Sequence, residues 1–189
     1  MIADALEGGF TEAPVQSARA FREILDAMAR PGRIRRVQGA APPVPLSVAA
    51  GVALLVLTDP TTRLHLAGAA DCPAVRDWVA FHIGAPLSCA EDADFAVGTW
   101  QALQPIHRFK IGQPDYPDRS ATLIVEVDRL ANHGAALTGP GIETAAWLNL
   151  PETAAFRANR ALCPLGFDTL FTVGDQIAGL PRSTRVEAI

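Results

Sequence analysis

The sequence lacks most of the features by which enzymes and secreted proteins are recognised. Only one of its 189 residues is lysine, Lys110, whereas fifteen are arginine, and it has three cysteines, Cys72, Cys89 and Cys163. Because their number is odd and no two are close in sequence, we expect reduced thiols in a cytoplasmic protein and no disulfide framework. The thiols of Cys72 and Cys163, which each precede a proline, are expected to be buried and inert.

Long apolar segments are also absent. The longest, Pro45–Leu57, has thirteen residues, whereas a transmembrane helix needs about 20. It is therefore predicted to form a buried helix or strand, and no membrane association is expected. The first residues, MIADALEGGFTEAP, include acidic side chains and no apolar core, so we expect no secretory signal peptide.

The charge of the chain is slightly negative. Its formal net charge is −4 and its pI is about 5.5, which argues against nucleic acid as a partner because such binding needs a basic face. Hydrophobic residues make up 49% and charged residues 19%, a globular composition. A single domain is therefore predicted over residues 1–189, with disorder expected within residues 1–15.

The common catalytic and metal-binding motifs are missing. The four histidines are at least seventeen residues apart, and neither HExxH nor CxxC occurs, so no metal site is predicted. The nucleophile elbow G-x-S-x-G, the P-loop and the G-x-G-x-x-G turn are absent too. A Schiff-base enzyme using pyridoxal phosphate would depend on Lys110, which lies near no evident phosphate-binding loop. We identify no catalytic residue and expect no cofactor.

Four helices are predicted from apolar periodicity and end signals. The first follows a cap at Ser17 and ends at Pro31-Gly32, and a second follows a cap at Ser47. A third begins at Pro73 and ends at Gly84, and a fourth begins at Pro151 with Asn149 as its cap. The side chains expected to face inward are Phe21, Ile24, Leu25 and Met28 in the first helix, Val75, Trp78, Val79 and His82 in the third, and Phe156 and Leu162 in the fourth.

Strands alternate with these helices. They are predicted in residues 33–38, 61–68, 93–98, 121–127 and 134–142, and in a hairpin over 167–181 that turns at Gly174-Asp175-Gln176. Residues 99–112 have no clear pattern. Helices alternating with strands, with a hairpin at the end, predict an α/β sandwich with a mixed sheet.

Two short stretches are candidates for ligand binding. Thr138–Ile142, TGPGI, has Gly139 and Gly141 around a proline after a predicted strand. Such a turn can present backbone N–H groups to an anion, or it can be a plain turn.

The second stretch holds Arg182 and Arg185 in the C-terminal IAGLPRSTRVEAI. In one extended strand these two side chains point to opposite faces, which weakens a joint phosphate clamp and favours separate roles, at least one of them in assembly. A solvated strand end is the alternative. The candidate ligand-binding residues are thus Thr138, Gly139, Gly141, Arg182 and Arg185.

Several segments together resemble one known family. AFREILDAMARPGRI, FHIGAP, LTGPGI and CPLGFDTLFTVGDQIAGLPRSTRVE occur in that order, and they resemble the PhnH family of subunits of the bacterial carbon–phosphorus lyase complex. The resemblance runs from about Phe21 to Glu187 and is weak over about residues 90–118. Its most specific positions are Pro164-Leu165-Gly166, Asp168, Gly174, Pro181-Arg182, Thr184 and Val186-Glu187.

The resemblance implies a fold and a context. It implies a reduced pyridoxal-phosphate-transferase fold, a single-domain α/β/α sandwich without the cofactor, that forms a homodimer alone and joins the other core subunits in phosphonate catabolism. The complex supports transfer of a phosphonate onto the ribose of a purine nucleoside triphosphate. Radical iron–sulfur chemistry belongs to another subunit, and three scattered cysteines here are too few for such a cluster.

Two roles follow for the chain itself. One is that of an accessory, non-catalytic subunit with no activity alone. The alternative is a ligand-binding or catalytic subunit with its own phosphonate or nucleotide pocket. Trp78, Phe81 and Trp147 are candidate interface residues, with a place in the core as the alternative for each.

Overall fold

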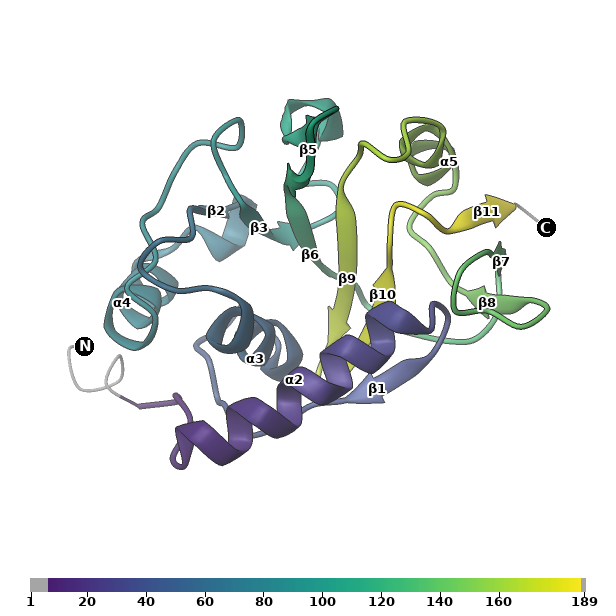
Figure 1. Cartoon of the computed structure of the whole chain (residues 1–189). Helices are drawn as coiled ribbons and strands as arrows, with labels where there is room; N and C mark the ends of the chain where they lie inside the picture. Colours follow the sequence, from purple (N-terminus) through teal and green to yellow (C-terminus); the bar gives the residue numbers. More distant parts are fainter. Residues whose placement is uncertain (1–6, 188–189) are drawn as a thin grey trace.

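The computed structural model describes residues 7–187, which form a mixed α/β fold around a six-stranded sheet (Figure 1). The strands lie in the order β1-β10-β9-β6-β3-β2. Strands β2, β3, β6 and β9 run parallel, while β10 is antiparallel to β9 and to β1. The predicted mixed sheet is thus confirmed. The strand bounds are β1 Ile34–Arg36, β2 Leu64–Leu66, β3 Phe95–Thr99, β6 Thr122–Glu126, β9 Asp168–Val173 and β10 Gln176–Leu180.

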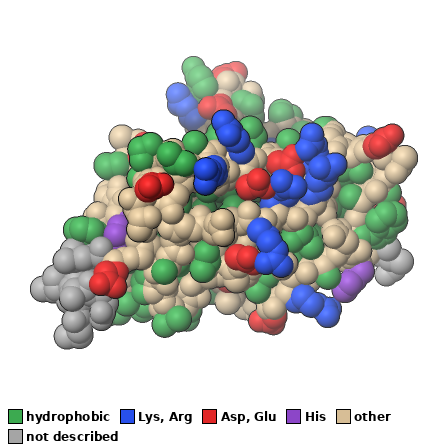
Figure 2. Space-filling view, turned by 90° about the horizontal axis from the view of Figure 1, so that it is seen from below, with side chains coloured by type: hydrophobic (Ala, Val, Ile, Leu, Met, Phe, Trp, Pro, Cys, Tyr) green, Lys and Arg blue, Asp and Glu red, His purple; other side chains and the backbone are tan. Residues whose placement is uncertain are grey.

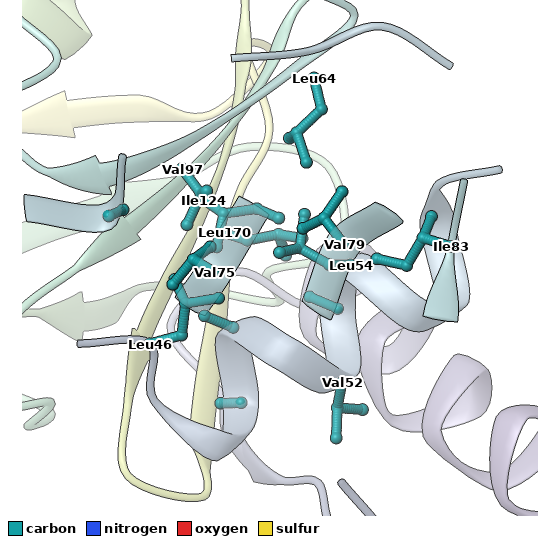
Figure 3. Packing of buried hydrophobic residues seen from close by; sticks show 14 of the residues in the cluster. Leu46, Val52, Leu54, Leu64, Val75, Val79, Ile83, Val97, Ile124 and Leu170 are labelled. Atoms are coloured by element: carbon teal, nitrogen blue, oxygen red, sulfur yellow. The ribbon is translucent and has the colours of Figure 1, made fainter. Parts of the chain in front are cut away.

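Three helices cover one face of this sheet: α2 (Ala13–Ala29), α3 (Val48–Leu57) and α4 (Pro73–His82). Helix α3 is capped as predicted, because the Ser47 hydroxyl accepts from the backbone N–H of Ala50 at 3.1 Å. Figure 3 shows Leu54 of α3 and Val75 and Val79 of α4 packed with Ile124 and Leu170 of the sheet.

The other face is covered by α5 (Ala154–Ala161) and by a three-stranded sheet, β11-β7-β8. Leu123 and Val125 point toward this layer, whereas Ile124 between them points toward α3. Both faces of β6 are therefore buried, which explains its unbroken apolar run. The bounds are β7 Ala135–Thr138, β8 Ala146–Leu148 and β11 Arg185–Glu187.

Part of residues 99–112, for which the sequence predicted no secondary structure, folds into short elements near the amino ends of the parallel strands. A 3-10 turn, η2 (Ile106–Arg108), leads into the hairpin β4 (Ile111–Gln113) and β5 (Tyr116–Ser120), which extends away from α2–α4 in Figure 1. A second 3-10 turn, η1 (Gly68–Ala70), precedes α4. The hairpin was not predicted, because its half-exposed strands carry little apolar alternation.

Helix α2 differs from the prediction in its start and in its buried face. It begins at Ala13 after Glu12, so Ser17 lies inside it and is not its cap. The buried side chains are Ala20, Ile24 and Ala27, while Phe21 is 47% and Leu25 54% exposed. The prediction that Phe21 and Leu25 face inward is therefore wrong.

The reason lies in β10. A Cβ atom at Gly179 would stand 2.7 Å from the carbonyl oxygen of Ala27, so the backbones of α2 and β10 approach closely. This contact holds the side of α2 with Ala20, Ile24 and Ala27 against the sheet, and it leaves Phe21 and Leu25 exposed.

Helix α5 also begins later than predicted, after Thr153, and Leu162 is exposed, not buried. Phe156 points inward as predicted. Asn149 is not a helix cap: its side chain accepts from the backbone N–H of Ala131 at 2.6 Å and donates to the carbonyl of Arg129 at 2.7 Å.

Two further expectations, on the cysteine thiols and on the candidate interface residues, concern exposure. Cys163 is exposed, so the prediction that its thiol is buried is wrong, while Cys72 is half-buried. Among the candidate interface residues Trp78 is fully buried in the core, whereas Phe81 and Trp147 are exposed.

Residues 1–6 of the N-terminal segment expected to contain disorder lie outside the described residues, and residues 13–15 belong to α2. Within residues 7–187 no helix combines the length and apolar character needed to cross a bilayer.

Candidate functional site

The C-terminal segment does not form one strand. Strand β10 ends at Leu180, and the backbone N–H of Thr184 then donates to the carbonyl of Pro181 at 2.9 Å, which closes a turn. Strand β11 begins at Arg185 and belongs to the other sheet. The prediction of a continuous strand through Arg182 is therefore wrong, because Pro181 has no N–H to continue the β10 ladder.

Arg182 sits in this turn and is fully engaged. Its guanidinium donates to both oxygens of Asp168, at 3.2 and 2.5 Å, to the carbonyl of Pro117 at 2.7 Å and to the hydroxyl of Ser120. The side chain is 14% exposed, and the gap beside it has no room for a water molecule. Arg182 thus joins the start of β9 to the β4–β5 hairpin.

The other four predicted residues lie near the end of the small sheet. Arg185 pairs with Thr138 in the β11–β7 register, and a Cβ at Gly139 would stand 3.3 Å from the carbonyl oxygen of Ser183. Gly141, at φ +79°, faces the end of α2, where a Cβ would stand 1.9 Å from the carbonyl oxygen of Ala29. Close backbone packing thus accounts for both glycines, and a ligand role for the four residues stays a prediction.

A cleft of about 820 Å³ lies at the amino ends of β2, β3 and β6, beside the β4–β5 hairpin. We name it the amino-edge cleft. Its charged lining residues are Arg63, Asp94, Lys110, Asp118 and Arg119.

The charges in this cleft centre on Asp94. Lys110, the only lysine of the chain, forms an ion pair with it, and the backbone N–H of Arg63 donates to it at 2.9 Å. The Arg63 guanidinium lies 3.8 Å from the same carboxylate. Burial would raise the pKa of Asp94, but the bonds from Lys110 and Arg63 outweigh it and hold that pKa below its usual value. The Arg63 guanidinium also lies 3.9 Å from the carboxylate of Asp92, so both cations are paired with carboxylates of the chain itself.

A second cleft, of about 450 Å³, lies at the opposite, carboxyl ends of β3 and β6, the edge at which open α/β sheets commonly bind ligands. Glu126 lines it, at the end of β6. The carboxylate accepts from the backbone N–H of Ser47 at 2.7 Å and from the hydroxyl of Thr172 at 3.1 Å. Burial nevertheless raises the pKa of Glu126. We name this the carboxyl-edge cleft.

Sequence reasoning missed both clefts. The amino-edge cleft was missed because its charged residues, Arg63, Asp94 and Lys110, are separated in the chain and form no known motif. The carboxyl-edge cleft was missed because Glu126 follows an apolar strand and has the pattern of an ordinary polar strand end. The one available indication was the rarity of lysine. Within residues 7–187, no three His, Cys, Asp or Glu side chains gather closely enough to hold a metal ion.

Fold and site together define a small mixed α/β protein with polar clefts at both edges of a parallel sheet core. The chain matches the model of the family described as "Bacterial phosphonate metabolism protein (PhnH)" over residues 8–187. It therefore belongs to the PhnH family, which confirms the resemblance noted in its sequence.

Two relatives extend almost the full length of the chain. The "Alpha-D-ribose 1-methylphosphonate 5-triphosphate synthase subunit PhnH" of Rhizobium meliloti (strain 1021) is 36% identical over 191 residues, which cover 95% of this chain and 94% of the relative. The "Putative C-P lyase subunit protein HtxG" of Stutzerimonas stutzeri is 27% identical over 196 residues, 95% of each chain.

Proposed function

We propose that this protein is an accessory, non-catalytic subunit of a phosphonate ribosyl triphosphate synthase, within a carbon–phosphorus lyase complex of the cytoplasm. In this role it supports transfer of a phosphonate onto the ribose of a purine nucleoside triphosphate and has no activity alone. The observation that carries the proposal is the match to a named synthase subunit over nearly all of both chains. The engagement of Arg182 by the protein's own groups supports a structural purpose for the most family-specific segment.

Co-purification tests this role. The protein is expressed with the other subunits of the synthase from the same organism and is captured by a tag. We expect a stoichiometric complex, together with restored growth on methylphosphonate in a strain that lacks this subunit. A folded protein that neither joins the other subunits nor restores growth would overturn the proposal.

The finer details of the fold and assembly also belong to this proposal. We propose that the sheet is a reduced pyridoxal-phosphate-transferase fold without cofactor, and that the protein alone is a homodimer. The position of Lys110 supports the proposal that no pyridoxal phosphate is bound. Its amine is paired with Asp94, whereas a Schiff base with the cofactor needs a free amine. The purified protein should show no cofactor absorbance after incubation with pyridoxal phosphate, and sedimentation should give twice the chain mass of 20.0 kDa.

A second candidate function is ligand binding in the amino-edge cleft. Three basic side chains, those of Arg63, Lys110 and Arg119, line this cleft beside two carboxylates, those of Asp94 and Asp118, so a phosphonate or nucleotide phosphate would bind to the basic groups through charge-assisted hydrogen bonds. The hydroxyls of Thr122 and Ser120 line the same space.

Thermal shift with ATP, a ribosyl phosphonate and inorganic phosphate tests this second function. A ligand at 100 times its dissociation constant adds about 2.7 kcal/mol to the stability of the folded state. The shift should disappear in Lys110→Met and persist in Arg129→Ala, at the carboxyl-edge cleft. If Arg185→Ala abolishes it instead, the site lies at Thr138 and Gly139. No shift with any compound would argue against a self-contained site.

A further inference from the structure

The two edges of the six-stranded sheet differ in how they are covered. At the β2 edge the chain covers itself, because Leu64 donates a backbone hydrogen bond to Pro86 and accepts one from Ser88, both at 2.9 Å. Strand β1 is the last strand at the other edge (Figure 1), and in the described part of the chain it pairs with β10 alone. The edge of β1 is therefore open to a further strand.

The backbone groups at this open edge follow from the β1–β10 register. The N–H of Val37 donates to the carbonyl of Asp175 at 2.8 Å. Because hydrogen-bonded positions alternate in an antiparallel pair, Arg35 bonds to β10 in the same way as Val37. The N–H and C=O groups of Ile34 and Arg36 therefore point away from β10, and no other group among the described residues hydrogen-bonds to them.

A groove of about 470 Å³ runs beside this edge, between β1 and helix α2. Its lining residues are Gln16, Arg19, Ala20 and Glu23 of α2 and Arg36, Val37, Gln38 and Gly39 at the end of β1. Arg36 thus belongs both to the groove and to the open edge. Extended peptides bind to other proteins by adding a strand at such an edge, with their side chains in adjacent pockets.

The charges around the groove and the edge are mostly positive. Five arginines, Arg19, Arg30, Arg33, Arg35 and Arg36, lie there with three carboxylates, those of Glu23, Asp26 and Asp175. The carboxylates pair with Arg30, Arg35 and Arg36. Figure 2, seen from below, shows basic side chains with acidic ones among them on this side. On a chain of net charge −4, the β1 edge therefore has a local excess of positive charge.

Two of these arginines carry the excess. Arg19 lines the groove and Arg33 directly precedes β1, and both are exposed. Within residues 7–187 neither of them forms an ion pair. A strand added along this edge would pass both guanidinium groups, one toward each end.

We propose that the open edge of β1 binds an extended segment of another synthase subunit, which adds a strand to the sheet and carries carboxylates opposite the arginines. The inference rests on the proposed function and adds to it the binding mode and the chemistry of the partner. The outward backbone groups of Ile34 and Arg36 would pair with the backbone of the segment. Its carboxylates would pair with Arg19 and Arg33, whose planar guanidinium groups suit carboxylates.

A second copy of β1 fits this edge poorly. Three of the four residues 33–36 are arginines, so each twofold pairing centred on a residue of β1 sets one arginine against another. A centre at Ile34 places Arg33 opposite Arg35, and a centre at Arg35 or Arg36 places that residue opposite its own copy. Like charges directly opposite each other destabilise a sheet. The arginines therefore exclude a second copy and favour a strand of opposite charge.

The first test removes one outward N–H from the edge. Arg36→Pro and Arg36→Ala both lack the guanidinium, but only proline also lacks the N–H. That N–H takes no part in the pairing with β10, so the sheet can keep its other hydrogen bonds. In capture of the other synthase subunits by the full chain, Arg36→Pro should bind at least tenfold more weakly than Arg36→Ala. Urea unfolding checks that both variants are folded. Equal affinity of two folded variants would overturn the inference.

The second test reverses charges and leaves the backbone unchanged. Arg19→Glu and Arg33→Glu each place a negative charge along the edge, and Arg157→Glu is the matched control at an exposed site of α5. We expect at least a fivefold loss of affinity for the other subunits in each of the first two variants and unchanged affinity in the control. Unchanged affinity in all three would show that the partner is not acidic at this edge.

Hydrogen exchange measures strand addition in the unaltered protein. In the protein alone the amides of Ile34 and Arg36 should exchange faster than the amide of Arg35, and in the complex both should be slowed at least tenfold. Slow exchange in the protein alone that depends on its concentration would show a second copy at the edge and would overturn the inference.

The two proposals fail in different ways. Wild-type protein that does not capture the other subunits would refute the proposed function. Capture in which the amides of Ile34 and Arg36 still exchange as fast as in the protein alone would refute strand addition and leave the proposed function intact.

Discussion

Arg182 and Asp168 are joined both through the backbone and through their side chains. The backbone N–H of Arg182 donates to Asp168 at 2.8 Å, and its guanidinium reaches both oxygens of the same carboxylate. The contact ties the first residue of β9 to the turn that follows β10. This turn sends the chain from one sheet to the other, so the pair fixes where β11 can form.

Loss of this pair should destabilise the fold. In Arg182→Ala the poorly exposed Asp168 loses its charged partner, and Pro117 and Ser120 lose a donor, at a cost of about 2–4 kcal/mol. Urea unfolding measures it, with Arg185→Ala as the control because Arg185 is exposed and its removal should cost less than about 0.5 kcal/mol. An Arg182→Ala protein with unchanged stability and unchanged complex formation would show that Arg182 has neither structural role.

Replacing Asn159 should also destabilise the fold. Its buried amide accepts from the backbone N–H of Phe167 at 2.9 Å and donates to the carbonyl of the same residue at 2.8 Å. Asn159→Ala leaves both backbone groups without partners, so we expect a loss of about 2–3 kcal/mol. Glu152→Ala, at an exposed position before α5, should change stability little in the same experiment. A loss below about 0.5 kcal/mol for Asn159→Ala would mean that water replaces the side chain.

Glu126 makes the stability of the protein depend on pH. Burial raises its pKa in the folded protein above the usual 4.5, so the ionised form destabilises the fold. That cost is absent below the unfolded pKa and develops as the pH rises through the folded pKa. The stability of Glu126→Gln relative to wild type should therefore increase from pH 4 to pH 8. Parallel stability curves across this range would contradict the raised pKa.

Lys110 and Asp94 give the opposite dependence. Because the pKa of Asp94 is held below its usual value of 3.8, the ionised carboxylate stabilises the fold, and this contribution disappears as the pH falls through the folded pKa. The pair is partly exposed, so Lys110→Met should cost about 1 kcal/mol or less at pH 7, and less still near pH 3. A cost that stays constant with pH would point to lost packing of the lysine stem and not to charge.

Much of the fold could be predicted from local sequence. The cap at Ser47 and Pro73 in the first turn of its helix act within one turn, and the hairpin at Gly174 needs only two adjacent strands. All three predictions are confirmed. The strand predicted over residues 121–127 is confirmed as β6.

The buried face of α2 could not be predicted in this way. Its sequence has apolar residues around most of its circumference, so periodicity alone does not distinguish Ile24 from Leu25. The choice depends on Gly179, which is more than 150 residues away in the chain and brings the helix backbone close to β10. The candidate clefts were hidden for the same reason, since Arg63, Asp94 and Lys110 meet only across the edge of the folded sheet.

The sequence by itself determined the family, the alternation of helices and strands and the family-specific C-terminal segment, because these depend on residue identity and on neighbours within a few positions. Only the tertiary structure decided that this segment divides at Pro181 between two sheets and that Arg182 is used by Asp168, Pro117 and Ser120. It also decided that Phe21 and Leu25 face outward. Hydrogen bonds and buried contacts join groups that are distant in the chain, so a local sequence pattern does not show which groups they join.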